Sequence, residues 1–402
     1  MNYTQKTLID ILNASIHKKK VNIQLYNEIN WDEMLKLSVE HNVTSLVYYG
    51  LKNSNLIENI PSDIINDFKK QTFFSSSFQL KHINNISEVL RLFHKNDIET
   101  VVLKGLVVRN FYPNAEFRTM GDADIVVKKE KLDKAINLLR DLGYEEYERT
   151  NVDICFIKGS SRIELHWNLI NQGRINGGEN FENNIWNELI TVKVGDEDAL
   201  SLNYEDLAVH LFVHLIKHLA DKGCGIRHFC DLVVLLESKE DEINWDSFWE
   251  KINEYKLEKS TKIVFYICTE YLGMNIKYKV DSKEYINEEY LQILLNDIMN
   301  HGVFGKSNEE ETFARAAAFN GDENEASPLK QYLKVFFPPV KRLMENYPYA
   351  EKYKILIPVA YIHRAFRCIV NKDISNKDKS RFIIHGLSVI KERSPIMEWL
   401  EL

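Results

Sequence analysis

The sequence predicts a mostly helical α+β fold in which a small mixed sheet lies between two helical regions. Up to about residue 97, apolar residues recur at helical spacing. From Thr100 to about Leu169 the pattern changes to strand, helix, strand, helix and two more strands, which indicates an α/β core. After residue 178 it is mostly helical again. We therefore predict a helical region at 1–97, a core at 98–200 and a C-terminal helical domain at 201–402.

The N-terminal region is predicted to consist of helices because its apolar residues return every three or four positions. Their expected bounds are Thr7 to Ile16, Trp31 to Glu40, Ser62 to Lys70, and about Phe73 to Lys95. Polar segments at 17–20, 172–178, 309–311, 322–325 and 377–381 are predicted to be solvated loops or surface.

The core begins with a predicted buried strand at Val101 to Leu103, followed by Lys104 and Gly105. Gly105 allows a tight backbone turn, and we expect the helix after it to direct N–H groups toward an anion. Lys104 adds a positive charge beside that turn. Together these features predict a phosphate site, although Lys104 is also compatible with an ordinary surface charge.

A second predicted strand carries two carboxylates, Asp122 and Asp124, which are two residues apart and therefore share one face. Neighbouring carboxylates repel each other unless a cation lies between them, and Mg²⁺ is typically held by one or two carboxylates together with substrate phosphates. The alternative is a turn or helix cap, since Gly121-Asp122 is also typical of turns. We predict metal binding, because a carboxylate next to Ile125 is costly to bury without a cation.

A third carboxylate is predicted at Glu164, on a strand at 162–167 where polar and apolar residues alternate. It could instead be a surface residue of an edge strand. His166 lies on the same face and is more often a hydrogen-bond donor behind a metal site than a ligand. If Glu164 is not a ligand, Asp153 on the neighbouring predicted strand is the next candidate.

The helix predicted from Tyr204 to Asp221 is apolar over about two thirds of its circumference. Its narrow polar stripe is expected to face a wet cleft, with solvent exposure as the simpler alternative. His210, His214 and His218 follow one another at i, i+4 spacing, so a metal-dependent hydrolase is a further alternative, which only this spacing supports.

Composition and charge limit the classes of function. Lys and Arg number 51 and Asp and Glu number 59, so the net charge of −8 disfavours binding to bulk nucleic acid. The N-terminus resembles no signal peptide and no run approaches 18 apolar residues, which predicts a cytoplasmic protein without a membrane partner. The five cysteines have no metal-type spacing and are expected to be buried thiols.

The motifs resemble the bacterial uncharacterised nucleotidyltransferase family of the DNA polymerase β-like superfamily, over roughly residues 5 to 370. The similarity lies in Leu103-Lys104-Gly105, Tyr112-Pro113, Arg118, Asp122-x-Asp124, Leu142-Gly143-Tyr144, Glu164-Leu165-His166-Trp167, His214-x-x-x-His218, Arg227 to Asp231 and Tyr347-Pro348. It implies a polymerase β-like core. One departure is Leu106, where the superfamily usually has Gly or Ser after the first glycine of the turn.

The resemblance implies transfer of a nucleoside monophosphate from an NTP to an acceptor, with two Mg²⁺ ions, or Mn²⁺, on Asp122, Asp124 and Glu164. The expected nucleotide or acceptor contacts are Lys104, Gly105, Arg118, Lys217, His218, Arg227 and Asp231. The acceptor could be a small molecule, a peptide or protein, or an RNA end. Leu106 keeps a second interpretation open, a nucleotide-binding or interaction module that has the fold and no catalysis.

Overall fold

The computed structural model describes residues 1–21, 29–169, 177–221, 223–302, 340, 343–344, 347–370 and 393–402. It contains two compact units. The first is Met1–Leu215 with Gly225–Ile286, and the second is Ile216–Cys224 with Asn287–Leu402. The prediction of three domains with boundaries near residues 97 and 200 stays a prediction.

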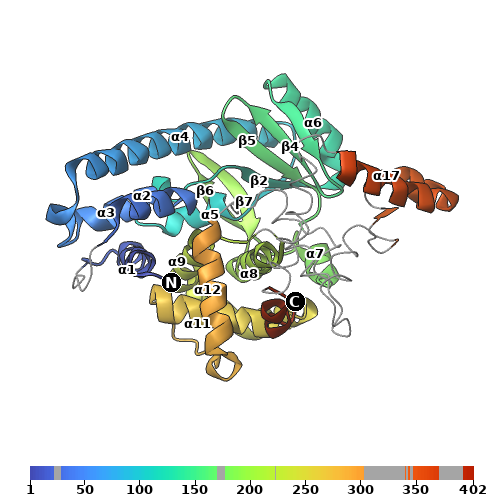
Figure 1. Ribbon diagram of the computed structural model, residues 1–402. Coiled ribbons are helices and arrows are strands. Elements are labelled where there is room, and N and C mark those ends of the chain that lie inside the picture. The colour runs from blue at the N-terminus through green and yellow to red at the C-terminus, as the bar shows by residue number, and fades with distance from the viewer. Residues whose placement is uncertain are drawn as a thin grey trace. The chain divides into compact units, whose positions relative to one another are not determined.

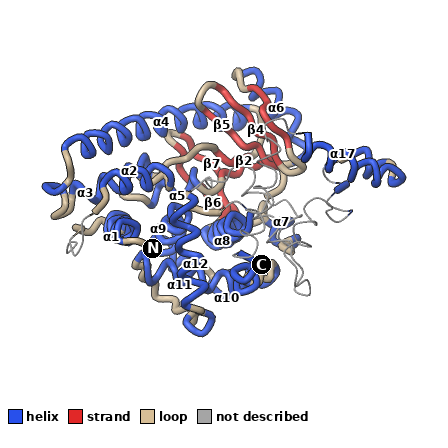
Figure 2. Tube along the Cα trace, viewed as in Figure 1, coloured by secondary structure: helices blue, strands red, loops and turns tan. Residues whose placement is uncertain are grey.

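Helices and one mixed sheet make up the first unit, as the predicted α+β class requires (Figures 1 and 2). Its helices are α1 Tyr3–Ile16, α2 Trp31–Glu40, α3 Thr44–Lys52, α4 Ser62–Lys95, α5 Gly105–Val108, α6 Leu132–Asp141, α7 Glu179–Asn184, most of α8 Tyr204–Asp221, α9 Ile226–Lys239, α10 Trp245–Glu254 and α11 Glu258–Leu272. Its strands are β1 Thr100–Val102, β2 Ala123–Val127, β3 Glu145–Arg149, β4 Asp153–Lys158, β5 Ser161–His166, β6 Leu189–Val194 and β7 Glu197–Leu202. The α+β class is therefore confirmed.

Several predicted helices are confirmed, and some begin at side-chain caps. The Asn30 side chain accepts the backbone N–H of Glu33, which fixes the start of α2. The two separate helices expected at Ser62 to Lys70 and about Phe73 to Lys95 are one continuous helix, α4. Helix α3 was not predicted. Asp206 lies in the first turn of α8, whose bounds match the prediction.

The strand order is β3-β4-β5-β2-β1-β7-β6. β1 is antiparallel to β2 and parallel to β7, β2 is parallel to β5, and the remaining neighbours are antiparallel. The described chain after residue 178 is mostly helical, as expected, but the hairpin of β6 and β7 was not predicted. Its two-residue turn, Gly195-Asp196, is a typical hairpin signal, and Gly195 has a φ of 60°.

The long helix α4 packs against β1, β6 and β7, while α5 contacts β2 and β6 as well as α9. The central strands are buried along their whole length, as Val101, Ile125 and Val126 show with no exposed surface. In this way two buried strands, β1 and β2, deliver the segment 103–105 and the pair Asp122 and Asp124 to the same part of the sheet.

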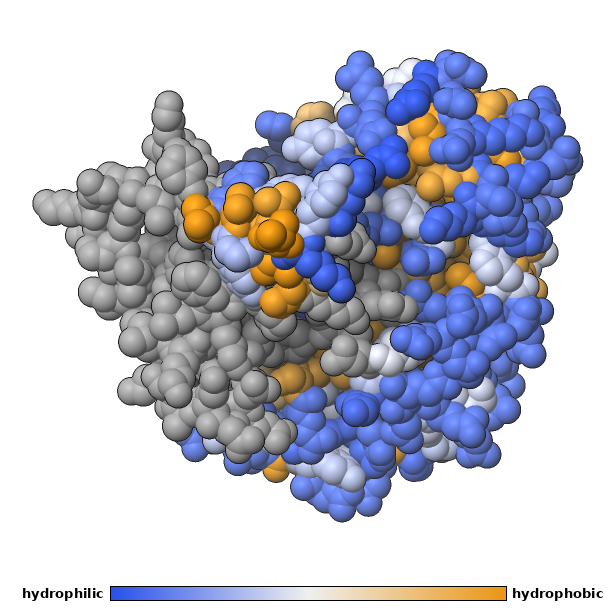
Figure 3. All heavy atoms as spheres, turned by 90° about the vertical axis from the view of Figure 1, so that its right-hand side faces the viewer, coloured by the Kyte–Doolittle hydropathy of each residue, from blue (hydrophilic) through white to orange (hydrophobic). Residues whose placement is uncertain are grey.

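Helices also dominate the described part of the second unit, which contains α12 Glu288–His301, α16 Pro348–Lys352 and α17 Ile357–Val370. Leu343, Tyr347, Ala350 and Ala360 form a small buried cluster. Apolar side chains gather on the face shown in Figure 3, and Ile355, Val359 and Ile362 are among the exposed large hydrophobic residues.

Cys155, Cys224, Cys230 and Cys268 are buried as predicted, whereas the side chain of Cys368 lies outside the description. Also outside it are the predicted loops at 309–311 and 322–325, the lysine cluster at 377–381 and most of the loop at 172–178. Among the described helices, none combines the length and apolar character needed to span a membrane.

Candidate active site

Strand register brings together acidic residues that are distant in the sequence. Asp124 on β2 is the direct partner of Glu164 on the parallel strand β5, and Val126 is the partner of His166. On the other side of β5, Asp153 of β4 is opposite His166. Because partners in adjacent strands point to the same face, the acidic side chains collect on one face of the sheet.

Asp124 lies at the centre of this group and is contacted by two cationic side chains. Lys104 Nζ is 2.7 Å from its Oδ1 atom, and His166 Nε2 is 3.2 Å from the same oxygen. Burial alone would raise the pKa of Asp124, but Lys104 and His166 hold that pKa below its ordinary value. Asp124 is therefore a carboxylate, with an exposed fraction of only 6%.

Asp122 has a different electrostatic environment although it is only two residues away. Burial, together with repulsion from Asp124 and Glu164, raises the pKa of Asp122 to about 6. The pKa of His166 rises to about 9, because hydrogen bonds to Asp124 and Glu164 outweigh the opposing effect of burial. The group thus holds more negative charge than its two cations easily balance, which favours binding of a further cation.

The donor atoms of this face are spaced suitably for one ion. One ligand atom each from Asp124, Glu164 and His166 lies within 4.8 Å of the others. Oxygen donors suit Mg²⁺, and the His166 imidazole, once metal binding displaces its proton, is also compatible with Mn²⁺. Of the predicted ligands, Asp124 and Glu164 are thus brought together with His166, while Asp122 interacts with them through its charge.

The turn at Lys104 differs from the expectation. The residue with positive φ is Lys104, at 45°, so the strained backbone lies one residue before Gly105. Gly105 is needed for close approach, because a Cβ atom there would lie 2.1 Å from Arg118 Nη1 and 2.5 Å from Met120 Sδ. Glycine at this position lets the Arg118 guanidinium lie directly against the backbone.

The helix after Gly105 also differs from the prediction that it directs several N–H groups toward an anion. α5 has only four residues, and the N–H of Leu106 already donates to the Leu103 carbonyl. The N–H groups of Val107 and Val108 both donate to the carbonyl of Lys104. These three groups are engaged within the turn, while the phosphate contacts predicted for Lys104 and Gly105 stay predictions.

Arg118 makes a buried, bidentate ion pair. Its Nε and Nη2 atoms donate to the two carboxylate oxygens of Asp231 on α9, at 3.1 and 2.7 Å. Tyr112 donates its hydroxyl to Asp231 at 2.7 Å, and Arg227 donates to the carbonyl of Thr119 at 2.6 Å. These bonds fix the loop that leads to Asp122, so the positions of Arg118, Arg227 and Asp231 are explained by packing. Their contact with a nucleotide stays a prediction.

Sequence reasoning missed two supports of this loop. Gln79 of α4 donates to the carbonyl of Met120 at 2.9 Å, and Ser75 lies 3.3 Å from the Thr119 hydroxyl. Both partners are more than 40 positions apart in the sequence. No local pattern could have indicated these contacts, because they depend on the path of α4.

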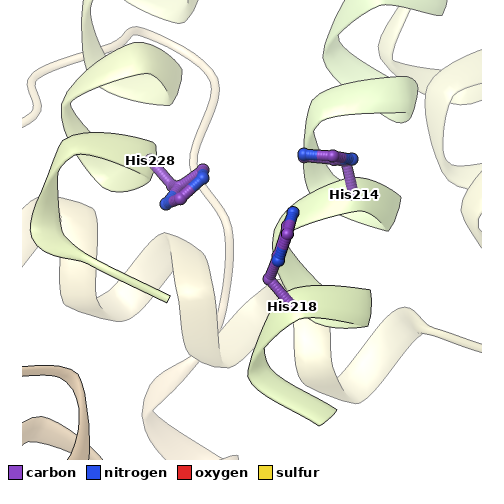
Figure 4. A group of neighbouring side chains, drawn as sticks. All are labelled: His214, His218 and His228. Atoms are coloured by element: carbon purple, nitrogen blue, oxygen red, sulfur yellow. The ribbon is translucent and has the colours of Figure 1, made fainter. Parts of the chain in front are cut away.

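α8 carries the remaining predicted residues. Lys217 and His218 lie near its C-terminal end, and their contact with a nucleotide stays a prediction. The rings of His210 and His214 are stacked, with centroids 6.1 Å apart. A possible metal-binding group, however, consists of His214, His218 and His228, as Figure 4 shows, and does not include His210.

Comparison with known proteins gives the family. No curated protein matches the sequence. Two solved structures are similar at low TM-score. The antibiotic-resistance factor ANT(2'')-Ia has a TM-score of 0.34 and 8% identity, covering 47% of this chain and 98% of its own. The lincosamide antibiotic adenylyltransferase LnuA has a TM-score of 0.28 and 18% identity, and the match covers 38% of this chain and 94% of LnuA.

The family model described as "Uncharacterised nucleotidyltransferase" matches residues 27–273, which is more than half of the chain's 402 residues. This range includes the sheet, the acidic face and the Arg118–Asp231 ion pair. It therefore confirms the resemblance that the motifs indicated. The chain belongs to the family of uncharacterised nucleotidyltransferases.

Proposed function

We propose that the protein transfers a nucleoside monophosphate from an NTP to a hydroxyl group of an acceptor and releases pyrophosphate. The observation that carries this proposal is the register between β2 and β5, which sets Asp124 directly beside Glu164. Family membership supports the same reaction class. In such transfers the protein contributes mainly positioning and neutralisation of charge.

The proposed metal is Mg²⁺, or Mn²⁺, held by Asp122, Asp124 and Glu164. Bound there, two such ions would neutralise the phosphates and make the acceptor hydroxyl more acidic. Asp122 and Asp124 would hold the triphosphate side, and Glu164 the acceptor side. Glu164 would also accept the proton of the acceptor hydroxyl, directly or through water.

Lys104 is proposed to contact the β- or γ-phosphate. Lys104 Nζ and His166 Nε2 both contact the same oxygen of Asp124, so the ammonium group of Lys104 is held at the acidic face. When another cation occupies Asp124, the lysine can exchange this ion pair for a phosphate oxygen. Arg118 would hold the loop before Asp122 in place and would not bind phosphate through Nε or Nη2, because both of these nitrogens donate to Asp231.

A small molecule or a protein is the proposed acceptor class. The net charge of −8 gives a repulsive field for a long polyanion, whereas a single triphosphate accompanied by divalent ions is much less affected. Electrostatic repulsion therefore favours acceptors that do not carry a long phosphate backbone.

The test is metal-dependent nucleotide binding, measured by calorimetry and by the melting temperature with each of the four NTPs. We expect one NTP or more to bind only with Mg²⁺ or Mn²⁺ and to raise the melting temperature. Asp124→Asn should abolish this binding, while Asp141→Asn, at an exposed position on α6, should leave it unchanged. Binding that survives Asp124→Asn would contradict the site.

A non-catalytic nucleotide-binding module is the second candidate, favoured by the committed N–H groups after Lys104 and by the buried Leu106. Glu164→Gln separates the two. For an enzyme we expect NTP binding within a few-fold of the parent and release of pyrophosphate reduced by roughly 10²-fold or more. A parent protein that binds NTP and releases no pyrophosphate with any acceptor class would support the module.

A further inference from the structure

Three histidines of α8 and α9 form a group to which the proposed nucleotidyl transfer assigns no catalytic role, although His218 is also a predicted nucleotide contact. His214 and His218 are four residues apart on α8, and His228 lies on the first turn of α9. One ring nitrogen from each lies within 4.8 Å of the others, and Figure 4 shows the three imidazoles turned toward a common space.

The arrangement of the three rings follows from local structure. α8 is one continuous helix from Tyr204 to Asp221, so the turn that separates His214 from His218 places both on the same face. The rings of His214 and His228 have centroids 6.2 Å apart. Two of the imidazoles therefore belong to a single helical face, and the third is adjacent to the first.

The spacing is close to what a metal ion requires. Three atoms at most 4.8 Å apart all lie within about 2.8 Å of a common point, and the usual Zn–N distance is about 2.0–2.1 Å. Each nitrogen would need to move by less than about 1 Å, which small side-chain rotations can supply.

The tautomer of His228 is also suitable. Its Nδ1 atom lies 3.2 Å from the carbonyl oxygen of Gly225, and because a carbonyl can only accept, the proton is on Nδ1. The Nε2 atom of the neutral ring then carries the lone pair that a metal needs. Metal-binding histidines usually have such a second hydrogen bond, which fixes the ring and raises its basicity.

We propose that His214, His218 and His228 bind a transition-metal ion of the Zn²⁺ class. Three imidazole donors favour Zn²⁺, Co²⁺ or Ni²⁺ over Mg²⁺, which prefers oxygen. This site is chemically distinct from the carboxylate face, and it does not depend on the proposed nucleotidyl transfer.

The test uses the full chain after treatment with a chelator, titrated with Co²⁺ and with Zn²⁺. We expect one equivalent of Co²⁺ to give the visible absorption of tetrahedral nitrogen coordination, and Zn²⁺ to displace it. His214→Gln and His228→Gln should each weaken binding by at least about tenfold, since each removes one of three donors. His94→Gln, at an exposed position on α4, is the matched control and should bind as the parent does.

Asp124→Asn distinguishes this site from the acidic face. Retention of the Co²⁺ absorption in this variant supports the proposal, and its loss there would overturn it. If a histidine variant does not fold, modification of the parent by diethyl pyrocarbonate gives an independent measurement. Zn²⁺ should protect His214, His218 and His228 and leave His94 reactive. Equal modification with and without Zn²⁺ would contradict the site.

Discussion

At the scale of single residues, the ion pair between Lys104 and Asp124 is the clearest stabilising contact of the acidic face. Lys104→Met keeps most of the side-chain volume and removes the charge. We expect the free energy of unfolding to fall by about 3 kcal/mol, because the largely buried Asp124 carboxylate then loses a cation at 2.7 Å. Urea denaturation followed by circular dichroism measures the change.

The control for this substitution is a double-mutant cycle. Asp124→Asn removes the charge that Lys104→Met leaves without its partner, so the double variant should be more stable than the sum of the single losses predicts. Strictly additive losses would mean that the two side chains do not interact in solution.

Gly105 gives a second prediction at this scale. Gly105→Ala places a methyl group within 2.1 Å of Arg118 Nη1, so the guanidinium or the turn must shift. We expect a loss of about 1–3 kcal/mol in the free energy of unfolding, the usual cost of overpacking. In an Arg118→Gln background the same substitution should cost less, because the obstructing nitrogen is gone. An equal cost in both backgrounds would place the strain elsewhere.

At the scale of secondary-structure elements, α4 contains a buried histidine that reports on the packing of the helix. Burial, and then the charge of Arg109, lowers the pKa of His82 to about 4 from its ordinary value of 6.5. The unfolded chain therefore binds more protons than the folded protein between these pH values, and stability should fall as the pH is lowered from 6.5 to 4.

His82→Gln removes this titration and can keep a hydrogen bond to Ser161. We expect the variant to lose less stability than the parent over that pH interval, with a difference of roughly 3 kcal/mol from the size of the shift. Urea denaturation at several pH values measures it. Parallel curves for the two proteins would show that the His82 pKa is ordinary.

The elements themselves were predictable where one period dominates. α2 and α8 have regular helical spacing, and their bounds agree with the structure. β3 was not predicted because its sequence, Glu145–Arg149, is exposed and mostly charged, so no apolar alternation marks it. The β6–β7 hairpin was missed although Gly195-Asp196 marks its turn, because the strands on either side are short and partly exposed.

At the scale of the whole molecule, strand order and long-range pairs were beyond local patterns. The parallel pairing of β1 with β7 joins residues about 100 positions apart, and Tyr112 is bonded to Asp231 across 119 positions. Such contacts depend on how every element between them packs. The side chains of the acidic face were predictable, since Asp124 and Glu164 lie on strands and Asp122 immediately precedes β2, all in segments where polar and apolar residues alternate. The ion pair between Lys104 and Asp124 could not be predicted from the sequence.

Net charge supports a last prediction. With 59 acidic and 51 basic residues, the surface as a whole repels a polyanion, so few phosphate contacts can release counterions. We expect fluorescence anisotropy with labelled duplex DNA or polyadenylate to show no saturable binding tighter than about 10⁻⁴ M at moderate salt, which is the weak end of non-specific affinity. Under the same conditions, binding of an NTP with Mg²⁺ should persist. Tight polyanion binding that weakens steeply with salt would instead indicate a local basic patch strong enough to outweigh the overall charge, and would move the acceptor class toward RNA.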